Sequence, residues 1–437
     1  MYLQIGIILL IMIVAYALAN WWKLSVELCM LTAAVAGGIA GTFVKTPPLG
    51  QLSRHLVEGT FTYLDVILVF VTATIFISII SESGGVNYVV RGIIKIFYNK
   101  RIFALLLLMI VILIPGALTG AGSVSILTVG APCALALGYL GIPKRKVAAI
   151  LFIIGGLSAV APPVNIWAMI ISAGTAIPYV GFELPLGIPV LILGTFSILL
   201  LGWKSEKQIK LQDILREMPE VPEKMSWWRV ALPFLVFFGL VIVYRIWPFT
   251  VPILGLPLEF TIAAIVGLLI SPKKINILVL SRDTVMLLLP LLATMAIVGS
   301  LQQIMTVTGV RGLISYAVLS TPLLLLYVLL IFIIPASEGV LTYGAAAIIG
   351  VPLVWFLDSI GLHATVVIAG LTLLWPLGDG LPPTALIGRL SVMMSEYQES
   401  YWSFLKATWL PWIIITIVGI LMIIFSAKLG FLVQWSM

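Results

Sequence analysis

The sequence contains few charged residues and almost no cysteine or histidine. Of its 437 residues, 24 are Lys or Arg and 17 are Asp or Glu, so 9% are charged, against about 25% in a typical soluble protein. A folded surface with so little charge would not stay hydrated, which excludes a water-soluble globular enzyme, and the high hydropathy excludes a disordered chain. Two cysteines and two histidines are too few for a disulfide framework or a Cys/His metal cluster.

The motifs of catalysis and nucleotide binding are also missing. The sequence has no Ser/His/Asp set and no P-loop, and its glycine runs do not follow strands. We therefore expect neither an enzyme nor a bound cofactor. The net charge of +7 does not indicate a nucleic-acid partner, because Lys and Arg in membrane proteins mostly mark the loops that face the cytoplasm.

The sequence is rich in long apolar segments, and 62% of its residues are hydrophobic. A membrane-spanning helix needs about 20 predominantly apolar residues. Two of the apolar segments, 147–180 and 364–395, are too long for one straight span, and each contains a Pro-Pro pair. We therefore expect an all-α polytopic membrane protein with about ten spanning helices and two broken ones. The ten segments are 3–20, 25–45, 63–82, 147–180, 187–203, 230–247, 257–272, 284–303, 364–395 and 408–426.

The chain also repeats itself at an offset of 220 residues. Segments 111–170 and 331–390 share 12 identities in 60 positions, and half of the identical residues are Pro or Gly, whose backbone roles are hard to replace. Each copy includes a stretch of about 40 apolar residues, 102–141 and 321–360, with Gly or small polar residues near its first third. Such a stretch forms either two full spans or one re-entrant hairpin.

Charges around these two stretches favour the hairpins. Basic residues flank the first stretch on both sides, whereas the matched flanks of the second, around 315–321 and 364–366, contain none. If both are re-entrant hairpins that open to opposite sides, 19 of the 24 basic residues lie in the cytoplasm. This predicts an inverted-topology repeat, the architecture of secondary transporters. Its parts are a first repeat (1–203), a cytoplasmic linker (204–229) and a second repeat (230–437).

Four interruptions of the helical pattern are the expected functional region. The first hairpin tip (119–125) and first break (158–165) match a second tip (335–342) and a second break (378–384). Each Pro-Pro pair frees upstream carbonyl groups, which are candidate ligands for a small cation. Each interruption also exposes a helix N-terminus that favours an anionic group. Four such termini meeting at mid-membrane would bind an anion and one or more Na⁺ ions.

The polar side chains at these interruptions are the candidate ligands. Glu338 and Asp379 matter most, because an ionisable group at membrane depth is costly and is normally functional. Either could ligate Na⁺ or carry a coupling proton, unless the second tip reaches the outer interface and Glu338 is simply solvated. The hydroxyls of Ser123, Ser125 and Thr128 could instead bond to their own helix. The expected substrate-binding residues are Thr119, Ser123, Ser125, Asn165, Glu338, Asp379 and Thr384.

Residues 120–125, with Pro132 and Gly138-Tyr139 behind them and Pro162-Pro163 after them, resemble the large membrane subunit of tripartite ATP-independent periplasmic (TRAP) transporters. More broadly, the chain is similar to the ion transporter superfamily that includes the divalent anion:sodium symporters. The resemblance implies an elevator, in which two hairpins and two broken helices move against a scaffold. It also implies two Na⁺ sites, one formed by Gly120, Gly122, Ser123 and Asn165 and the other by Ser337, Gly339, Gly380 and Thr384.

The function that the resemblance implies is ion-coupled uptake of an organic anion such as a C4-dicarboxylate, with Na⁺ favoured over H⁺. It further implies the prokaryotic inner membrane with its lipid, a small membrane subunit and a periplasmic substrate-binding protein as partners. Glu338 and Asp379 depart from the family pattern and leave proton coupling open. A stand-alone cation/proton antiporter and an ion channel remain the alternatives.

Overall fold

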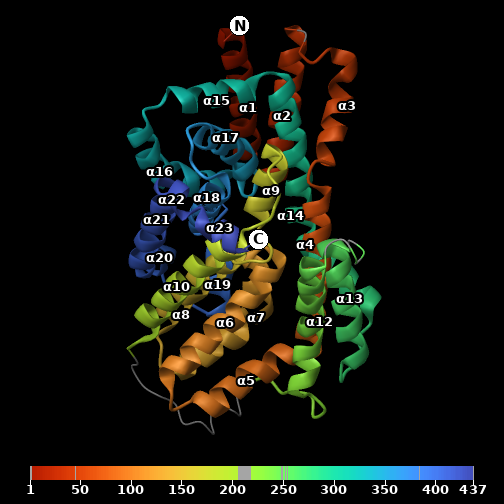
Figure 1. The fold of residues 1–437 in the computed structure, drawn as a ribbon, viewed down its shortest axis with the longest axis vertical. Coiled ribbons are helices and arrows are strands. Elements are labelled where there is room, and N and C mark those ends of the chain that lie inside the picture. The colour runs from red at the N-terminus through yellow and green to blue at the C-terminus, as the bar shows by residue number, and fades with distance from the viewer. Residues whose placement is uncertain are drawn as a thin grey trace.

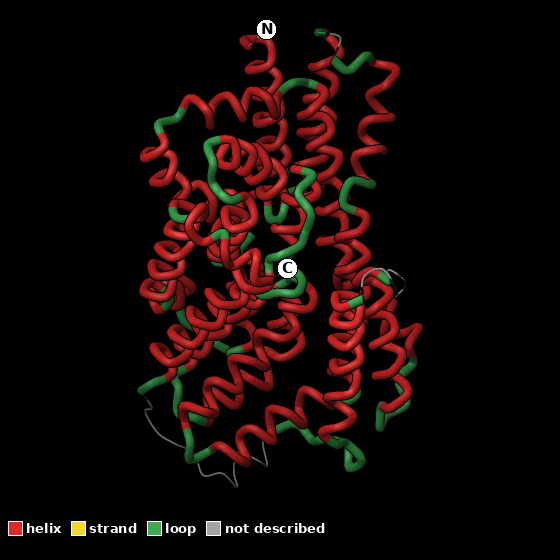
Figure 2. Tube along the Cα trace, in the orientation of Figure 1, coloured by secondary structure: helices red, strands yellow, loops and turns green. Residues whose placement is uncertain are grey.

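The fold is all-α throughout the part of the chain that the computed structural model describes. These residues are 2–44, 46–204, 218–247, 250, 252, 254–382 and 384–436. Within them every regular element is a helix and no strand occurs, as Figure 2 shows. The expected all-α fold is therefore confirmed for the described residues. Most of the expected linker, residues 205–217, lies outside them, as do Lys45 and Pro383.

The described residues of the first half form ten helices, and glycine or proline stands at several of their ends. The α6 helix stops where Gly120 adopts a left-handed conformation (φ 71°), and α8 is followed by Pro162 and Pro163, which lack the amide hydrogen that a continuing helix requires. The helices are α1 (Tyr2–Trp21), α2 (Val26–Phe43), α3 (Leu49–Thr60), α4 (Leu64–Glu82), α5 (Gly85–Phe97), α6 (Arg101–Thr119), α7 (Gly122–Tyr139), α8 (Lys144–Val160), α9 (Ile166–Thr175) and α10 (Glu183–Gly202).

The second half includes a π-helix, η1, between α16 and α17. The elements are α12 (Trp227–Ile246), α13 (Gly255–Ile270), α14 (Ile277–Val307), α15 (Val310–Ser320), α16 (Leu323–Leu341), η1 (Ala346–Gly350), α17 (Val351–Ser359), α18 (Ala364–Gly378), α19 (Leu386–Met394), α20 (Tyr401–Ala407), α21 (Trp409–Ile424), α22 (Ser426–Leu429) and α23 (Phe431–Ser436).

Nine helices in the described residues are long and apolar enough to cross a membrane, and a tenth is possible if α20 and α21, which meet at 55°, form one span. This agrees with a polytopic membrane protein, although three of the nine (α6, α7 and α16) lie in the stretches that were expected to be re-entrant hairpins. The individual bounds differ in places from the expected ones. The span expected at 63–82 is preceded by α3, which sequence hydropathy missed because its polar residues lower the average. The span expected at 257–272 is α13, with 16 residues.

The helices form two packed groups. In one group, α14 packs against α2 and α3, while α4 packs against α13, which also contacts α12. In the other, α8 lies among α6, α7, α10 and α18, and α18 packs against α16 and α21. Figure 1 shows α5 at the bottom of the molecule and α15 near the top, with the short helices α9 and α19 between them. The interrupted helices are therefore in the interior.

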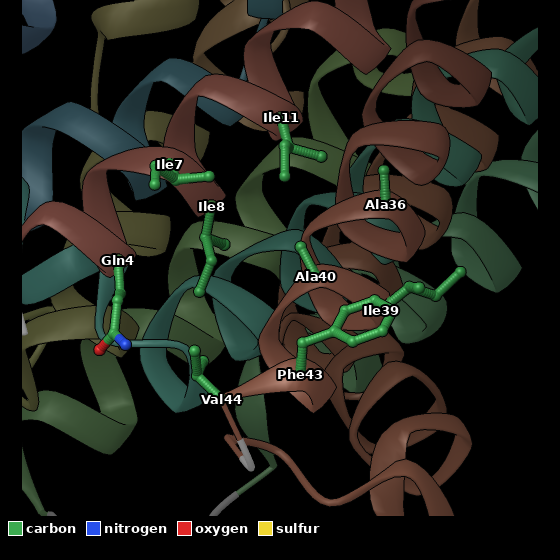
Figure 3. Close-up of a pocket in the computed structure, with 9 residues that line it drawn as sticks. All are labelled: Gln4, Ile7, Ile8, Ile11, Ala36, Ile39, Ala40, Phe43 and Val44. Atoms are coloured by element: carbon green, nitrogen blue, oxygen red, sulfur yellow. The ribbon is translucent and has the colours of Figure 1, made fainter.

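The outer helices present apolar side chains on the surface. On α1, Leu3 is 78% exposed and Ile13 is 56% exposed, and α12 likewise exposes Leu235 and Ile242. A groove of about 530 Å³ lies between α1 and α2, and its lining is apolar except for Gln4 (Figure 3). Exposed apolar surface of this extent is typical of membrane contact.

Candidate functional site

The helix is interrupted at three of the four expected places, whereas the second tip, expected at 335–342, is helical as far as Leu341 and the interruption follows it. In the first half, Gly120 and Ala121 separate α6 from α7, and residues 161–165 separate α8 from α9. In the second half, residues 342–345 separate α16 from η1, and residues 379–385 separate α18 from α19. We keep the names first tip (119–125), first break (158–165), second tip (335–342) and second break (378–384) for the expected segments, so that most of the second tip forms the last turns of α16.

The first tip rests directly on the first break. The amide of Val164 donates a hydrogen bond to the carbonyl of Ala117 at 3.0 Å. A Cβ atom added at Gly120 would lie 2.7 Å from Cγ1 of Ile166, and one added at Gly122 would overlap the carbonyl oxygen of Gly155. Both glycines are therefore required by close packing as well as by the turn, which is the structural reason for a glycine-rich tip.

Asn165 and Tyr179 hold the unwound backbone of the first break. The side chain of Asn165 caps α9 by accepting a hydrogen bond from the amide of Ala168 at 3.0 Å, and it donates to the carbonyl of Val160 at 3.2 Å. The backbone N–H of Asn165 donates to the hydroxyl of Tyr179 at 3.0 Å, and that hydroxyl donates to the carbonyl of Pro163 at 3.1 Å. The break is thus a hydrogen-bonded structure, as backbone at membrane depth must be.

The second tip and second break make the same kind of contact. The carbonyl of Gly339 accepts hydrogen bonds from both the amide (3.2 Å) and the hydroxyl (3.0 Å) of Thr384. A Cβ atom at Gly378 would overlap the carbonyl oxygen of Pro335 and lie 2.7 Å from Cβ of Glu338. The sequence-predicted pair Gly339 and Thr384 is therefore brought together by direct hydrogen bonds.

A tyrosine also supports the second break. The hydroxyl of Tyr401 donates to the carbonyl of Gly380 at 2.8 Å, and the amide of Gly388 donates to the carbonyl of Asp379 at 3.1 Å. Tyr401 therefore does for the second break what Tyr179 does for the first. Neither tyrosine was among the candidates from sequence. The only available signal was a tyrosine shortly after each broken helix, and the amphipathic ring of tyrosine is common in membrane proteins for other reasons.

The two acidic candidates are buried beside each other. Glu338 is 1% exposed and Asp379 is 5% exposed, and a Cβ atom added at Gly378, the residue before Asp379, would lie 2.7 Å from Cβ of Glu338. The indole nitrogen of Trp167 donates to Oε2 of Glu338 at 3.0 Å, and the ring of Trp167 lies 5.1 Å from that of Tyr343. The alternative in which Glu338 is solvated at the outer interface is therefore wrong. Trp167 and Tyr343 were missed by the sequence analysis.

Each half of the chain packs its broken helix against the hairpin of the other half. The α19 helix lies against α7, where Cδ1 of Ile387 would be 2.6 Å from a Cβ atom at Gly122. Correspondingly, α9 lies against η1 and α17, where Ile171 approaches Gly350. This crossed packing brings all four interruptions into one region of the interior.

The remaining candidate hydroxyls bond to backbone carbonyls. Thr119 donates to the carbonyl of Pro115 at 2.7 Å and Ser337 to that of Ile334 at 2.7 Å. Ser125 bonds across the hairpin to the carbonyl of Ile112, so it does not bond within its own helix, whereas Thr128 does so at the carbonyl of Val124 (2.7 Å). Ser123 is buried at the first tip.

The side chains near these interruptions offer few ligands to a metal ion. Among the residues that the structure describes, no three His, Cys, Asp or Glu side chains come together. A small cation in this region would have the carboxylates of Glu338 and Asp379 and backbone carbonyl groups as its oxygen ligands, which are the ligands that hard cations prefer. No protein-family model matches the chain, and no curated relative matches its sequence.

Proposed function

We propose that the protein is an ion-coupled secondary transporter of a small organic anion that belongs to the inverted-repeat class. The observation that carries this proposal is the meeting of four helix interruptions, two from each half of the chain, in one buried region. Unwound backbone inside a membrane protein is tolerated where it lines a binding site, and paired broken helices in two halves are the sequence and structural mark of transporter sites.

The positions of the helices support two copies of one fold. The helix α8 begins at Lys144 and α18 at Ala364, an offset of 364 − 144 = 220 residues. The same offset separates α9, which begins at Ile166, from α19, which begins at Leu386 (386 − 166 = 220). The helices α5 and α15, which precede the two hairpins, lie toward opposite ends of the molecule (Figure 1), as an inverted repeat requires.

The proposed mechanism is an elevator. The hairpins and broken helices form the moving group, while α1 to α4 and α12 to α14 form the scaffold. The scaffold and the moving group make a direct polar contact, in which the hydroxyl of Tyr16 in α1 donates a hydrogen bond to the carbonyl of Val340 at 2.6 Å. Sliding the moving group past the scaffold would carry the four interruptions from one side of the membrane to the other.

Sodium is the proposed coupling ion and a carboxylate the proposed substrate. Helix N-termini that meet at the interruptions favour an anionic substrate, and the carboxylates of Glu338 and Asp379 favour a small cation beside it. In this proposal the prokaryotic inner membrane is the location, and a small membrane subunit and a periplasmic binding protein complete the system.

The buried pair Glu338 and Asp379 supports a second candidate function, that of a cation/proton antiporter. Two neighbouring carboxylates in an apolar region cannot both be charged at low cost unless a cation is bound beside them. When the cation leaves, a proton can take its place, and such a pair can therefore exchange a proton for a cation. The two candidates differ in whether an organic anion moves at all.

Uptake into proteoliposomes tests the proposal. Labelled carboxylates are offered under an inward Na⁺ gradient, and then under an equal K⁺ gradient or a pH gradient. We expect Na⁺-dependent uptake and counterflow of at least one carboxylate, and loss of Na⁺ dependence in Asp379→Asn. Cation movement driven by pH without any carboxylate uptake would favour the antiporter, and flux without counterflow would favour a channel.

A further inference from the structure

One buried hydrogen bond joins the two halves of the site. Trp167 is the second residue of α9, two positions after the capping residue Asn165. Its indole N–H reaches Oε2 of Glu338, 171 residues away in sequence, at 3.0 Å. Trp167 is fully buried and Glu338 is 1% exposed, so water does not compete for this bond.

Each end of this hydrogen bond lies beside one of the two proposed ion sites. Asn165 is part of the set at the first tip and first break, and its hydrogen bonds fix the start of α9, from which Trp167 projects. Glu338 lies between Ser337 and Gly339, which belong to the set at the second tip and second break. The two sets are therefore connected by a short rigid path, which consists of residues 165–167 at the start of α9 and the hydrogen bond from Trp167 to Glu338.

The ring of Trp167 is also fixed in place. It packs against Tyr343, whose ring centroid lies 5.1 Å away at an angle of 45°, and Tyr343 itself is 5% exposed. Since the indole cannot swing freely, a displacement of the start of α9 must move the N–H donor relative to Glu338. Such a movement therefore acts on the carboxylate of Glu338, which accepts the hydrogen bond.

We infer that Trp167 is a positioning residue that couples two cation sites, one in each half of the chain. An ion that orders the first break sets the start of α9, and through the indole it fixes Glu338 for a second ion. By thermodynamic linkage the second ion strengthens binding of the first by the same factor. This inference rests on the proposed function, because it requires that small cations bind at the interruptions.

The chain provides a matched control for the test. Trp375, in α18, is also fully buried, but its indole nitrogen has no hydrogen-bond partner within the described part of the structure. Trp167→Phe and Trp375→Phe therefore remove the same atoms from equally buried rings, and only the first breaks a hydrogen bond. Binding of radiolabelled Na⁺ to the purified full-length protein is measured for the unmutated chain and for both variants.

We expect cooperative Na⁺ binding with a Hill coefficient of about 1.5 in the unmutated protein and in Trp375→Phe, which corresponds to about 10-fold coupling between two sites. In Trp167→Phe we expect a value near 1, equivalent to the loss of about 10-fold coupling between the sites. Cooperativity that survives in Trp167→Phe would overturn the inference alone. No Na⁺ binding in the unmutated protein would overturn it together with sodium coupling itself.

A second measurement does not depend on the folding of Trp167→Phe. Na⁺ affinity is measured for Asn165→Ala, for Glu338→Gln and for the double variant. If the two sites are linked through α9, the effects are non-additive by a factor of about 10, because each substitution removes the benefit that the other site supplied. Additive effects would contradict the inference.

Discussion

The cap on α9 provides the sharpest test of the first break. In Asn165→Ala the amide of Ala168 loses its acceptor and the carbonyl of Val160 loses its donor. An N-cap contributes about 1 kcal/mol, and a further intramolecular hydrogen bond about 1 kcal/mol. Together they predict a loss of about 2 kcal/mol, which is roughly a 30-fold increase in local opening of the break.

Hydrogen–deuterium exchange followed by mass spectrometry measures this opening directly. Peptides that cover residues 161–175 should exchange roughly 30-fold faster in Asn165→Ala, and in Asn165→Ser, which retains a capping oxygen, only about 5-fold faster. The matched control is Asn276→Ala, because Asn276 caps α14 through the amide of Val279 at 3.3 Å on an exposed surface. That variant should speed exchange about 5-fold at the start of α14 and leave the break unchanged.

If Asn165→Ala exchanges at the same rate as the unmutated protein across residues 161–175, the two side-chain hydrogen bonds do not hold the break. The role assigned to Asn165, and the path from it to Glu338, would then have no structural basis.

Two further predictions concern the second tip and second break. Gly378→Ala places a methyl group against the carbonyl oxygen of Pro335 and should lower the free energy of unfolding by about 1–3 kcal/mol, measured as a lower unfolding temperature in detergent. The control is Gly312→Ala, because no atom lies within 4 Å of the added Cβ. Equal unfolding temperatures for the two variants would contradict the close contact at Gly378. Tyr401→Phe removes the hydrogen bond to the carbonyl of Gly380 and should lower the Na⁺ affinity severalfold without changing the maximal uptake rate. A fall in the maximal uptake rate alone would show that Tyr401 acts elsewhere.

The sequence predicted the first tip and both breaks because their causes are local. A proline lacks an amide hydrogen and a glycine permits a left-handed turn wherever the rest of the chain lies, so Gly120 and Pro162 mark breaks without knowledge of the fold. The all-α class follows for a similar reason, because long apolar segments can satisfy their backbone groups in a membrane only as helices or closed barrels. The helix α3 was missed because its polar residues give no hydropathy signal.

The partners of the interruptions could not be predicted in this way. The contact between Trp167 and Glu338 joins residues 171 positions apart, and nothing near either residue indicates the other. Tyr179 and Tyr401 are likewise recognised only when their hydroxyls are seen against the unwound backbone. These contacts depend on the crossed packing of the two halves, which is a property of the assembled fold.

The crossed packing also has a consequence for how the protein is made. When the ribosome has released the first ten helices, α9 has no η1 or α17 to lie against, and α7 has no α19. The faces of α7 and α9 that the second half covers therefore stay without these partners until the second half is synthesised. A chain that ended before η1 would leave both faces unpaired with the helices that cover them in the complete fold.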